Sequence, residues 1–218
     1  MTMPRRVLVL APHADDAEFG IGAYIARATD AGWHVTVVIG ATGNYHRGSV
    51  WIDGGSREGE ARKALAHLGV TDVRFEKWFN ENLALAADYT RIVTGIENLV
   101  SGYDEVYVCL PSFNQDHRVL HDAFLTATRP GRTTANLYAY EYPGNCWGPP
   151  LPTCGKKYLV CSPVHAVRKL EALMMHKSQF DGRFVCVGPQ AAKSLLDQRG
   201  SEVGPDPAEL VYVMREFG

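Results

Sequence analysis

The chain has 218 residues, of which 46% are hydrophobic and 21% charged, and its formal net charge is −2. This is the balance of an ordinary globular protein, and the small net charge argues against nucleic acid or an anionic membrane as the main partner. No segment approaches 18 consecutive apolar residues, so the sequence offers no transmembrane helix. The apolar stretch near the N-terminus is too short for a signal peptide, and we expect a cytoplasmic protein.

Strands and helices alternate along most of the chain. We predict strands over residues 7–11, 34–39, 70–75 and 105–110, and helices over about 19–31, 56–68, 88–100, 116–128 and 162–176. Ser56 is the expected N-cap of the second helix, and residues 138–142 alternate like a further strand. This order predicts a single α/β domain over residues 1–218, with a Rossmann-like, mostly parallel sheet and helices on both faces.

Residues 143–155 form the least regular stretch, with four Pro, three Gly, two Cys and Trp147. We interpret this stretch as a loop near the active site, with Trp147 as a candidate for stacking on a sugar. The cysteines form no Cys-x-x-Cys pair, which argues against a structural zinc site. Only Cys146 and Cys154, at the two ends of the loop, leave room for a disulfide.

Chemically active side chains follow two of the predicted strands. His13, Asp15 and Asp16 come directly after residues 7–11, and Asp116 and His117 come shortly after residues 105–110. Open α/β sheets bind their ligands at the carboxyl ends of strands. A catalytic zinc takes three protein ligands, commonly imidazoles and carboxylates, and keeps one position for water.

These residues predict a site for one Zn²⁺ per chain, held by His13, Asp16 and His117, although the same donors also suit Fe²⁺. Asp15 is then a surplus carboxylate that can act as a general base, or alternatively cap the following helix. Asp116 can instead orient a histidine ring through a hydrogen bond.

Five motifs in order resemble the PIG-L/LmbE-like zinc de-N-acetylases, which include the N-acetylglucosaminyl deacetylases. They are Pro-His-Ala-Asp-Asp-Ala-Glu at 12–18, the Arg-x-x-Glu-Ala helix ending in Leu-Gly at 57–69, Asn-Gln-Asp-His at 114–117, His-Lys-Ser-Gln at 176–179, and the block at 199–209. The resemblance implies that His13, Asp16 and His117 bind zinc, that Asp15 is the general base and that Arg57 lies near the substrate. Glu18 and His176 belong to the matching motifs, and we include them as substrate-binding or supporting residues.

One departure from the family pattern concerns proton transfer. Many members have a histidine where this chain has Asn114, and an amide can donate a hydrogen bond but cannot shuttle a proton at neutral pH. His121, His176, His46 and Tyr45 are alternative proton donors. The substitution of Ala14 for the usual proline changes no chemical group.

The sequence therefore predicts a zinc-dependent hydrolase that removes an N-acetyl group from a small amino-sugar substrate, using metal-activated water with Asp15 as base. One alternative is an amidase for another acyl group, or for a glycopeptide, thiol-sugar or nucleoside amide. Another is a non-catalytic sugar binder, and a cofactor-binding Rossmann protein lacks its Gly-x-Gly-x-x-Gly fingerprint here. A homo-oligomer is compatible with the sequence, and no nucleic acid or membrane partner is expected.

Overall fold

The computed structural model describes residues 4–47, 49–79, 89–147, 154–180 and 188–217. Its centre is a seven-stranded sheet in the order β5-β2-β1-β6-β7-β9-β8. The first five strands in this order are parallel, and β9 runs antiparallel to both β7 and β8. The strands are β1 Arg6–Ala11, β2 His34–Ala41, β5 Asp72–Phe79, β6 Glu105–Cys109, β7 Asn136–Tyr140, β8 Lys156–Val160 and β9 Ala208–Arg215.

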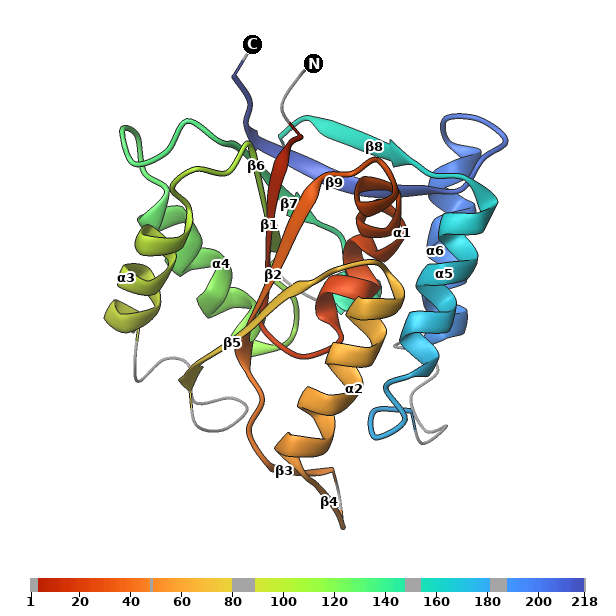
Figure 1. Cartoon of the computed structure of the whole chain (residues 1–218), viewed down its shortest axis with the longest axis horizontal. Coiled ribbons are helices and arrows are strands. Elements are labelled where there is room, and N and C mark those ends of the chain that lie inside the picture. Colours follow the sequence, from red (N-terminus) through yellow and green to blue (C-terminus); the bar gives the residue numbers. More distant parts are fainter. Residues whose placement is uncertain (1–3, 48, 80–88, 148–153, 181–187, 218) are drawn as a thin grey trace.

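Helices cover both faces of this sheet (Figure 1). One face carries α1 Asp16–Asp30, α2 Gly54–His67, α5 Pro163–Met174 and α6 Pro189–Ser201. The other face carries α3 Tyr89–Leu99 and α4 Gln115–Ala127, which pack against each other. The predicted α/β fold with a mostly parallel sheet and helices on both faces is confirmed.

Strand β1 lies at the centre of the sheet, and its residues from Val7 to Ala11 are fully buried. The chain first builds β2 and β5 on one side of β1, and then β6 and β7 on the other. The direction of winding thus reverses between β1 and β6. In doubly wound folds this reversal opens the crevice in which ligands bind, at the carboxyl ends of the two strands.

Several elements differ from the sequence-based expectation. Residues 45–47 and 50–52, expected in a loop, form a two-stranded hairpin, β3 Tyr45–Arg47 and β4 Val50–Ile52. Its three-residue strands are too short for an alternation pattern to indicate them. Helix α1 begins at Asp16, earlier than predicted, and is broken at Ile21. Strands β8 and β9 and helix α6 were not predicted.

The N-cap of α2 is Asp53, and the prediction of Ser56 is wrong. The Asp53 carboxylate accepts a hydrogen bond from the Ser56 backbone N–H at 2.8 Å. A Cβ on the next residue, Gly54, would lie 2.0 Å from the Thr42 carbonyl oxygen. Only glycine therefore lets the start of α2 press against the end of β2, and this contact fixes the helix that carries Arg57.

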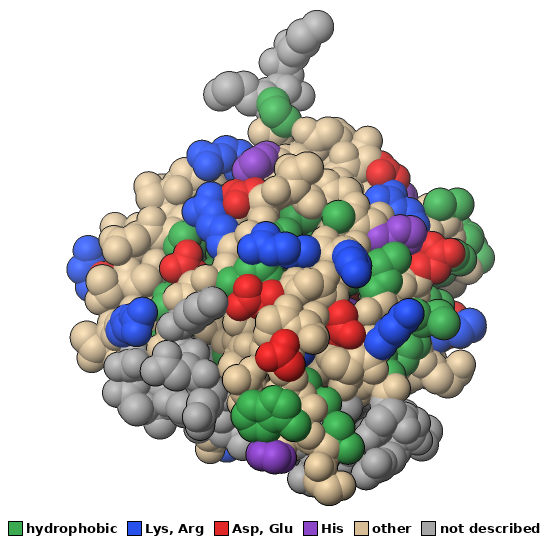
Figure 2. Space-filling view, turned by 60° about the horizontal axis from the view of Figure 1, so that its bottom comes forward, with side chains coloured by type: hydrophobic (Ala, Val, Ile, Leu, Met, Phe, Trp, Pro, Cys, Tyr) green, Lys and Arg blue, Asp and Glu red, His purple; other side chains and the backbone are tan. Residues whose placement is uncertain are grey.

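None of the described helices is long and apolar enough to span a membrane. On the face shown in Figure 2, basic and acidic side chains of the described residues are interspersed. That mixture gives no single-sign field on this face. The thiols of Cys109, Cys154 and Cys161 are free, so Cys154 is not in a disulfide.

Candidate metal centre and active site

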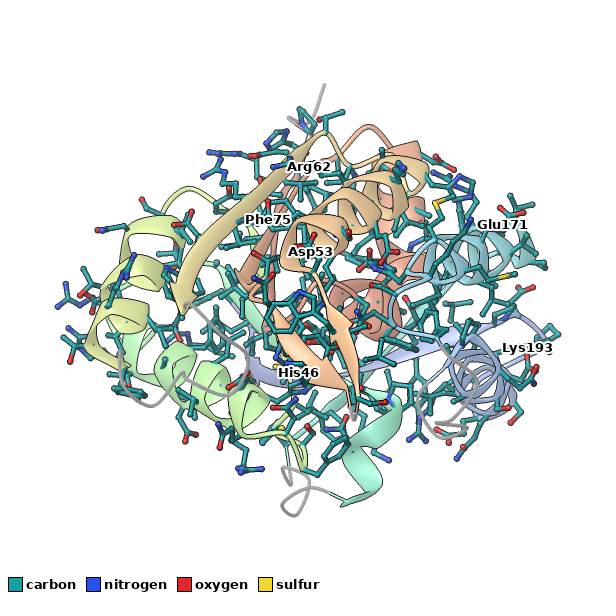
Figure 3. The ribbon with its side chains drawn as sticks, turned by 90° about the horizontal axis from the view of Figure 1, so that it is seen from below. His46, Asp53, Arg62, Phe75, Glu171 and Lys193 are labelled. Carbon is teal, nitrogen blue, oxygen red and sulfur yellow. The ribbon has the colours of Figure 1, made fainter. Side chains whose placement is uncertain are left out.

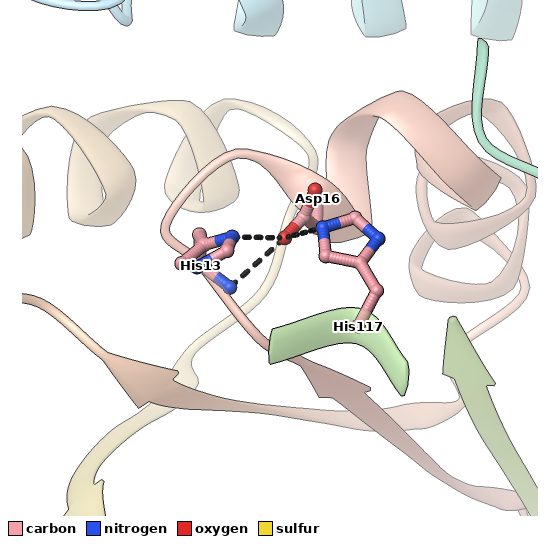
Figure 4. A group of neighbouring side chains, drawn as sticks. All are labelled: His13, Asp16 and His117. Atoms are coloured by element: carbon pink, nitrogen blue, oxygen red, sulfur yellow. Dashed lines mark hydrogen bonds and ion pairs between the residues drawn. The ribbon is translucent and has the colours of Figure 1, made fainter. Parts of the chain in front are cut away.

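His13, Asp16 and His117 converge at the carboxyl ends of β1 and β6 (Figure 4). His13 lies in the loop after β1, Asp16 is the first residue of α1, and His117 lies in the first turn of α4. The Asp16 Oδ2 atom is 3.1 Å from His13 Nδ1 and 3.3 Å from His117 Nε2. All three side chains are buried, and their three ligand atoms lie within 4.8 Å of one another.

This donor set fits a tetrahedral zinc ion. Ligand atoms about 2.0–2.1 Å from a tetrahedral ion lie about 3.3 Å from each other, which matches both distances to Asp16 Oδ2. The His13 backbone N–H also donates to Asp16 Oδ2 at 2.9 Å, which orients the carboxylate. Two imidazoles and one carboxylate leave a fourth position for water or substrate, as catalytic zinc sites do.

Asp116 lies behind His13 and fixes the orientation of its ring. The Asp116 carboxylate is 2.9 Å from His13 Nε2, so the other ring nitrogen, Nδ1, faces Asp16. Carboxylate–histidine pairs of this kind commonly orient metal-binding imidazoles. Burial lowers the pKa of His13, but the hydrogen bonds to Asp116 and Asp16 outweigh it and raise the pKa to about 9.

The carboxylate of Asp16 is held in its charged form. Burial raises the pKa of Asp16, but the charges and hydrogen bonds of His117 and His13 outweigh it and keep the pKa well below its ordinary value. The same arrangement that stabilises protonated imidazoles around this carboxylate would stabilise a divalent cation between them.

Asp15 occupies the N-cap position of α1 but makes no capping hydrogen bond with its side chain. It is partly exposed, whereas its neighbour Asp16 is buried. The alternative that Asp15 serves as the helix cap is therefore not supported by its contacts. A carboxylate next to the metal ligands, and reached by solvent, is suited to accept a proton from water.

Arg57, from the first turns of α2, is buried without any hydrogen bond to its Nε and Nη1 atoms. Its guanidinium lies 5.2 Å above the ring of Tyr45, in β3. The charge of Arg57 lowers the pKa of His13, although by less than the two carboxylates raise it. Burying a cation without partners is costly, so Arg57 is a candidate for binding an oxygen atom of a ligand.

Asn114 acts as the N-cap of α4. Its side-chain oxygen accepts a hydrogen bond from the Asp116 backbone N–H at 2.9 Å. This bond starts the helix that carries Asp116 and His117. The residue at the position of the usual histidine therefore orients the metal-binding turn.

Glu18 and His176 form a fully buried pair, with His176 Nε2 3.0 Å from Glu18 Oε1. Burial raises the pKa of Glu18, and His176 partly offsets this effect. Burial lowers the pKa of His176, but the Glu18 charge outweighs it and raises that pKa. The structure thus places His176 against the first turn of α1, and its described contacts do not include the three presumed ligands.

The other alternative proton donors lie in different surroundings. His121 Nδ1 is bonded to the Cys109 carbonyl at 2.9 Å, and burial lowers its pKa. His46 packs edge-on against Trp51 in the hairpin, which crosses in front of the sheet when viewed from the site end (Figure 3). The Tyr45 hydroxyl donates to Gln179 at 2.8 Å. The side chain of Trp147 lies outside the described part of the structure.

The structure adds Tyr142 to the site. Its ring packs edge-on against His117, with 5.0 Å between ring centroids, and also contacts Phe19. The aromatic alternation at 138–142 indicated packing but gave no sign of this contact. Glu141, between the two tyrosines, pairs instead with Arg199 at 2.8 Å.

A family model described as PIG-L, GlcNAc-PI de-N-acetylase, matches residues 8–128. This match covers more than half of the chain and includes all three presumed ligands and Asp15. The chain belongs to this family of deacetylases.

Individual proteins agree with this assignment. An uncharacterized deacetylase, YaiS of Escherichia coli, is 28% identical over 79% of this chain and 90% of its own length. A 1D-myo-inositol 2-acetamido-2-deoxy-alpha-D-glucopyranoside deacetylase of Salinispora arenicola is 40% identical over 34% of this chain and 28% of its own length. The solved structure of teicoplanin deacetylase Orf2 in a zinc-inhibited form has a TM-score of 0.76, with 17% identity, covering 97% of this chain and all of that one.

Proposed function

We propose that this deacetylase is a zinc-dependent hydrolase that removes the N-acetyl group from a small molecule containing an amino sugar. The observation that carries the proposal is the convergence of His13 Nδ1, Asp16 Oδ2 and His117 Nε2 next to the uncapped carboxylate of Asp15. A non-catalytic sugar binder would need neither a metal-binding set nor an adjacent base.

A zinc ion bound by these three residues would polarise the amide carbonyl and lower the pKa of water. Asp15 accepts a proton from the attacking water as the oxygen of that water bonds to the amide carbon. The free N–H groups of Arg57 can stabilise the negative charge that develops on the carbonyl oxygen. The carbon–nitrogen bond then breaks, and the proton held by Asp15 passes to the leaving nitrogen. The products are acetate and a free amine.

The amino-sugar substrate is supported by the family and by one relative. The family description names a de-N-acetylase of GlcNAc-PI, and the Salinispora arenicola relative is named for an acetamido-glucopyranoside. Both names describe an acetamido group on a glucosamine ring. We therefore propose N-acetylglucosamine, joined to a second group, as the substrate class.

A bulkier substrate is favoured by exposed apolar side chains at the site end of the sheet. Trp51 is 55% exposed and Val50 42% exposed in the hairpin, and Phe113, just before Asn114, is 46% exposed. Exposed apolar side chains beside a site commonly bind an apolar part of the ligand. The second group, or a longer acyl chain, would lie against them.

The test measures release of the acyl group and of free amine by the protein loaded with one equivalent of zinc. The panel contains N-acetylglucosamine, its glycosides with polar and apolar aglycones, and the matching N-butanoyl and N-octanoyl compounds. Acetate release from the glycosides supports the proposal. Faster cleavage of a longer acyl group points to the amidase alternative. Zinc binding with no cleavage of any compound contradicts the hydrolase.

A further inference from the structure

Helix α1 is broken one turn after it begins, at Ile21, whose φ of −131° and ψ of 33° are not helical. A break leaves carbonyls before it and N–H groups after it without their usual partners within the helix. The short segment before the break carries Asp16 and Glu18, and follows directly on Asp15. The site thus depends on a single helical turn that the rest of α1 does not hold in place by continuous hydrogen bonding.

The amine of Lys169, from α5, takes up the free carbonyls before the break. Its Nζ donates to the Phe19 carbonyl at 2.8 Å and reaches the Gly20 carbonyl at 3.3 Å. The stem of Lys169 passes close to Gly22, where a Cβ would lie 3.0 Å from Lys169 Cγ. A glycine at position 22 therefore leaves room for the lysine.

The carboxylate of Glu209, from β9, takes up the free N–H groups after the break. It accepts the backbone N–H groups of Ala23 at 3.0 Å and of Tyr24 at 2.8 Å. The same carboxylate pairs with Lys169 Nζ at 2.6 Å. The ion pair therefore replaces the hydrogen bonds that α1 loses on both sides of the break.

This ion pair is buried, with 3% of the Lys169 side chain and 2% of the Glu209 side chain exposed. Buried ion pairs carry a large desolvation cost, and apolar side chains of similar volume are often at least as stabilising. Stability alone therefore does not explain why two charges are kept here. Their hydrogen bonds to the broken helix do.

Helix α5 supports the same turn at a second point. His176, seven residues and two helical turns after Lys169, pairs with Glu18. Leu173, between them, packs in a cluster with Phe19. Three contacts along one side of α5 thus converge on the turn that begins the active site.

We propose that the Lys169–Glu209 pair is a positioning device that holds the first turn of α1, and with it Asp15 and Asp16, in the geometry needed for metal binding and proton transfer. The catalytic part of this inference rests on the proposed function. The structural part, the restraint of residues 16–20, does not.

The chain offers a matched control on the same two helices. Arg168, the residue before Lys169, binds both carboxylate oxygens of Asp30 at 2.7 and 2.8 Å. This pair joins α5 to the far end of α1, beyond the break, and is partly exposed. Removing it also loosens α5 from α1 but leaves the break untouched.

The experiment compares Lys169→Met with Arg168→Met. The first readout is hydrogen exchange of the amides of residues 16–20 in metal-free protein, and the second is the zinc Kd by competition with a chelator. We expect Lys169→Met to raise both by at least tenfold, and to lower kcat with KM within twofold of wild type. Arg168→Met should change each quantity by less than twofold.

If Lys169→Met does not fold, Gly22→Ala decides, because its added Cβ presses on the lysine stem without removing a charge. It should raise exchange and zinc Kd by at least threefold. Unchanged exchange at residues 16–20 in the folded lysine variant, or in Gly22→Ala where that variant does not fold, overturns the inference, as does an equal effect of Arg168→Met. Because exchange is read without metal, an inactive or zinc-free protein would refute the proposed function and leave this test intact.

Discussion

The two edges of the same sheet each bury a carboxylate, and the two carboxylates are treated differently. At the amino end of β6, both oxygens of Glu105 are bonded, to Arg5 at 2.7 Å, to Tyr107 at 2.8 Å and to the hydroxyl of Tyr24. At the carboxyl end of β1, Asp16 faces two imidazoles whose nearest atoms lie at the spacing of metal ligands.

The comparison separates a structural network from a functional one. The partners of Glu105 are neutral hydroxyls and an arginine, and they complete its hydrogen bonding within the protein. Near Asp16, nitrogens of Arg57 and His117 stay buried without a protein partner. Since buried polar groups are almost always satisfied, the edge that leaves them unsatisfied is the one prepared for a ligand.

The largest effect is expected at Asp15, which makes the sharpest contrast with Glu105. Replacing Asp15 by Asn removes the proton acceptor while keeping the size of the side chain, and should lower kcat by about 10³-fold with zinc still bound. Asp30→Asn, at the other end of α1, is the control and should retain full activity. A zinc-loaded Asp15→Asn protein within tenfold of wild-type kcat would contradict the assigned role.

A smaller loss is expected from the unpartnered cation. Arg57→Met should lower kcat/KM by about 10²-fold, because it removes donors aimed at the substrate. It should not destabilise the fold, since no hydrogen bond to the guanidinium Nε or Nη1 is lost. Arg62→Met, one to two turns later on α2 and packed over Phe75, serves as the control. Equal activity of the two variants would show that Arg57 does not touch the substrate.

The opposite edge should respond in stability alone. Glu105→Gln disturbs a carboxylate that accepts hydrogen bonds from two tyrosine hydroxyls, and should lower the free energy of unfolding by about 2 kcal/mol. Its kcat and zinc content should stay within twofold of wild type. Chemical denaturation and steady-state assays measure both. Loss of activity in the folded variant would mean that the two edges are not independent.

The smallest effect concerns protons at His13. Its pKa of about 9 lies above the ordinary value of 6.5, so its ring is charged at pH 7 in metal-free protein. The stabilisation it gives that form is complete below pH 6.5 and is lost as pH rises through 9. Zinc must displace this proton, so its apparent affinity should rise with pH up to about 9.

Calorimetry of zinc binding in buffers of different ionisation enthalpy measures the displaced proton. About one proton should be released per zinc at pH 7, and the number should fall above pH 9. Asp116→Asn removes a hydrogen bond that raises this pKa, and should reduce the release. Binding without proton release at pH 7 would place the protonated ring elsewhere.

The parallel half of the fold could be predicted because its strands are short runs of branched apolar residues between helices with clear ends. The other half could not. Strand β8, Lys156–Val160, begins with two lysines, and β9 carries the buried Glu209, because each faces a special contact. Tertiary structure there overrides the local pattern.

The site was partly readable for a similar reason. His13 and Asp16 are three residues apart, so their proximity follows from the turn after β1. Their contact with His117, about a hundred residues away, depends on the pairing of β1 with β6, which no local pattern specifies. The break in α1 and the Lys169–Glu209 pair gave no sequence signal, because a helix pattern runs through Ile21 and the two partners lie forty residues apart.

The central claim is that three side chains bind one zinc ion. Metal content by mass spectrometry after dialysis against one equivalent of zinc tests it, in wild type, in His117→Ala and in His121→Ala. His121 lies one turn further along α4 and bonds to a backbone carbonyl, so it is the matched control. We expect one zinc per chain in wild type and His121→Ala and less than a tenth of that in His117→Ala. Equal zinc in all three proteins, or none in wild type, would contradict the account.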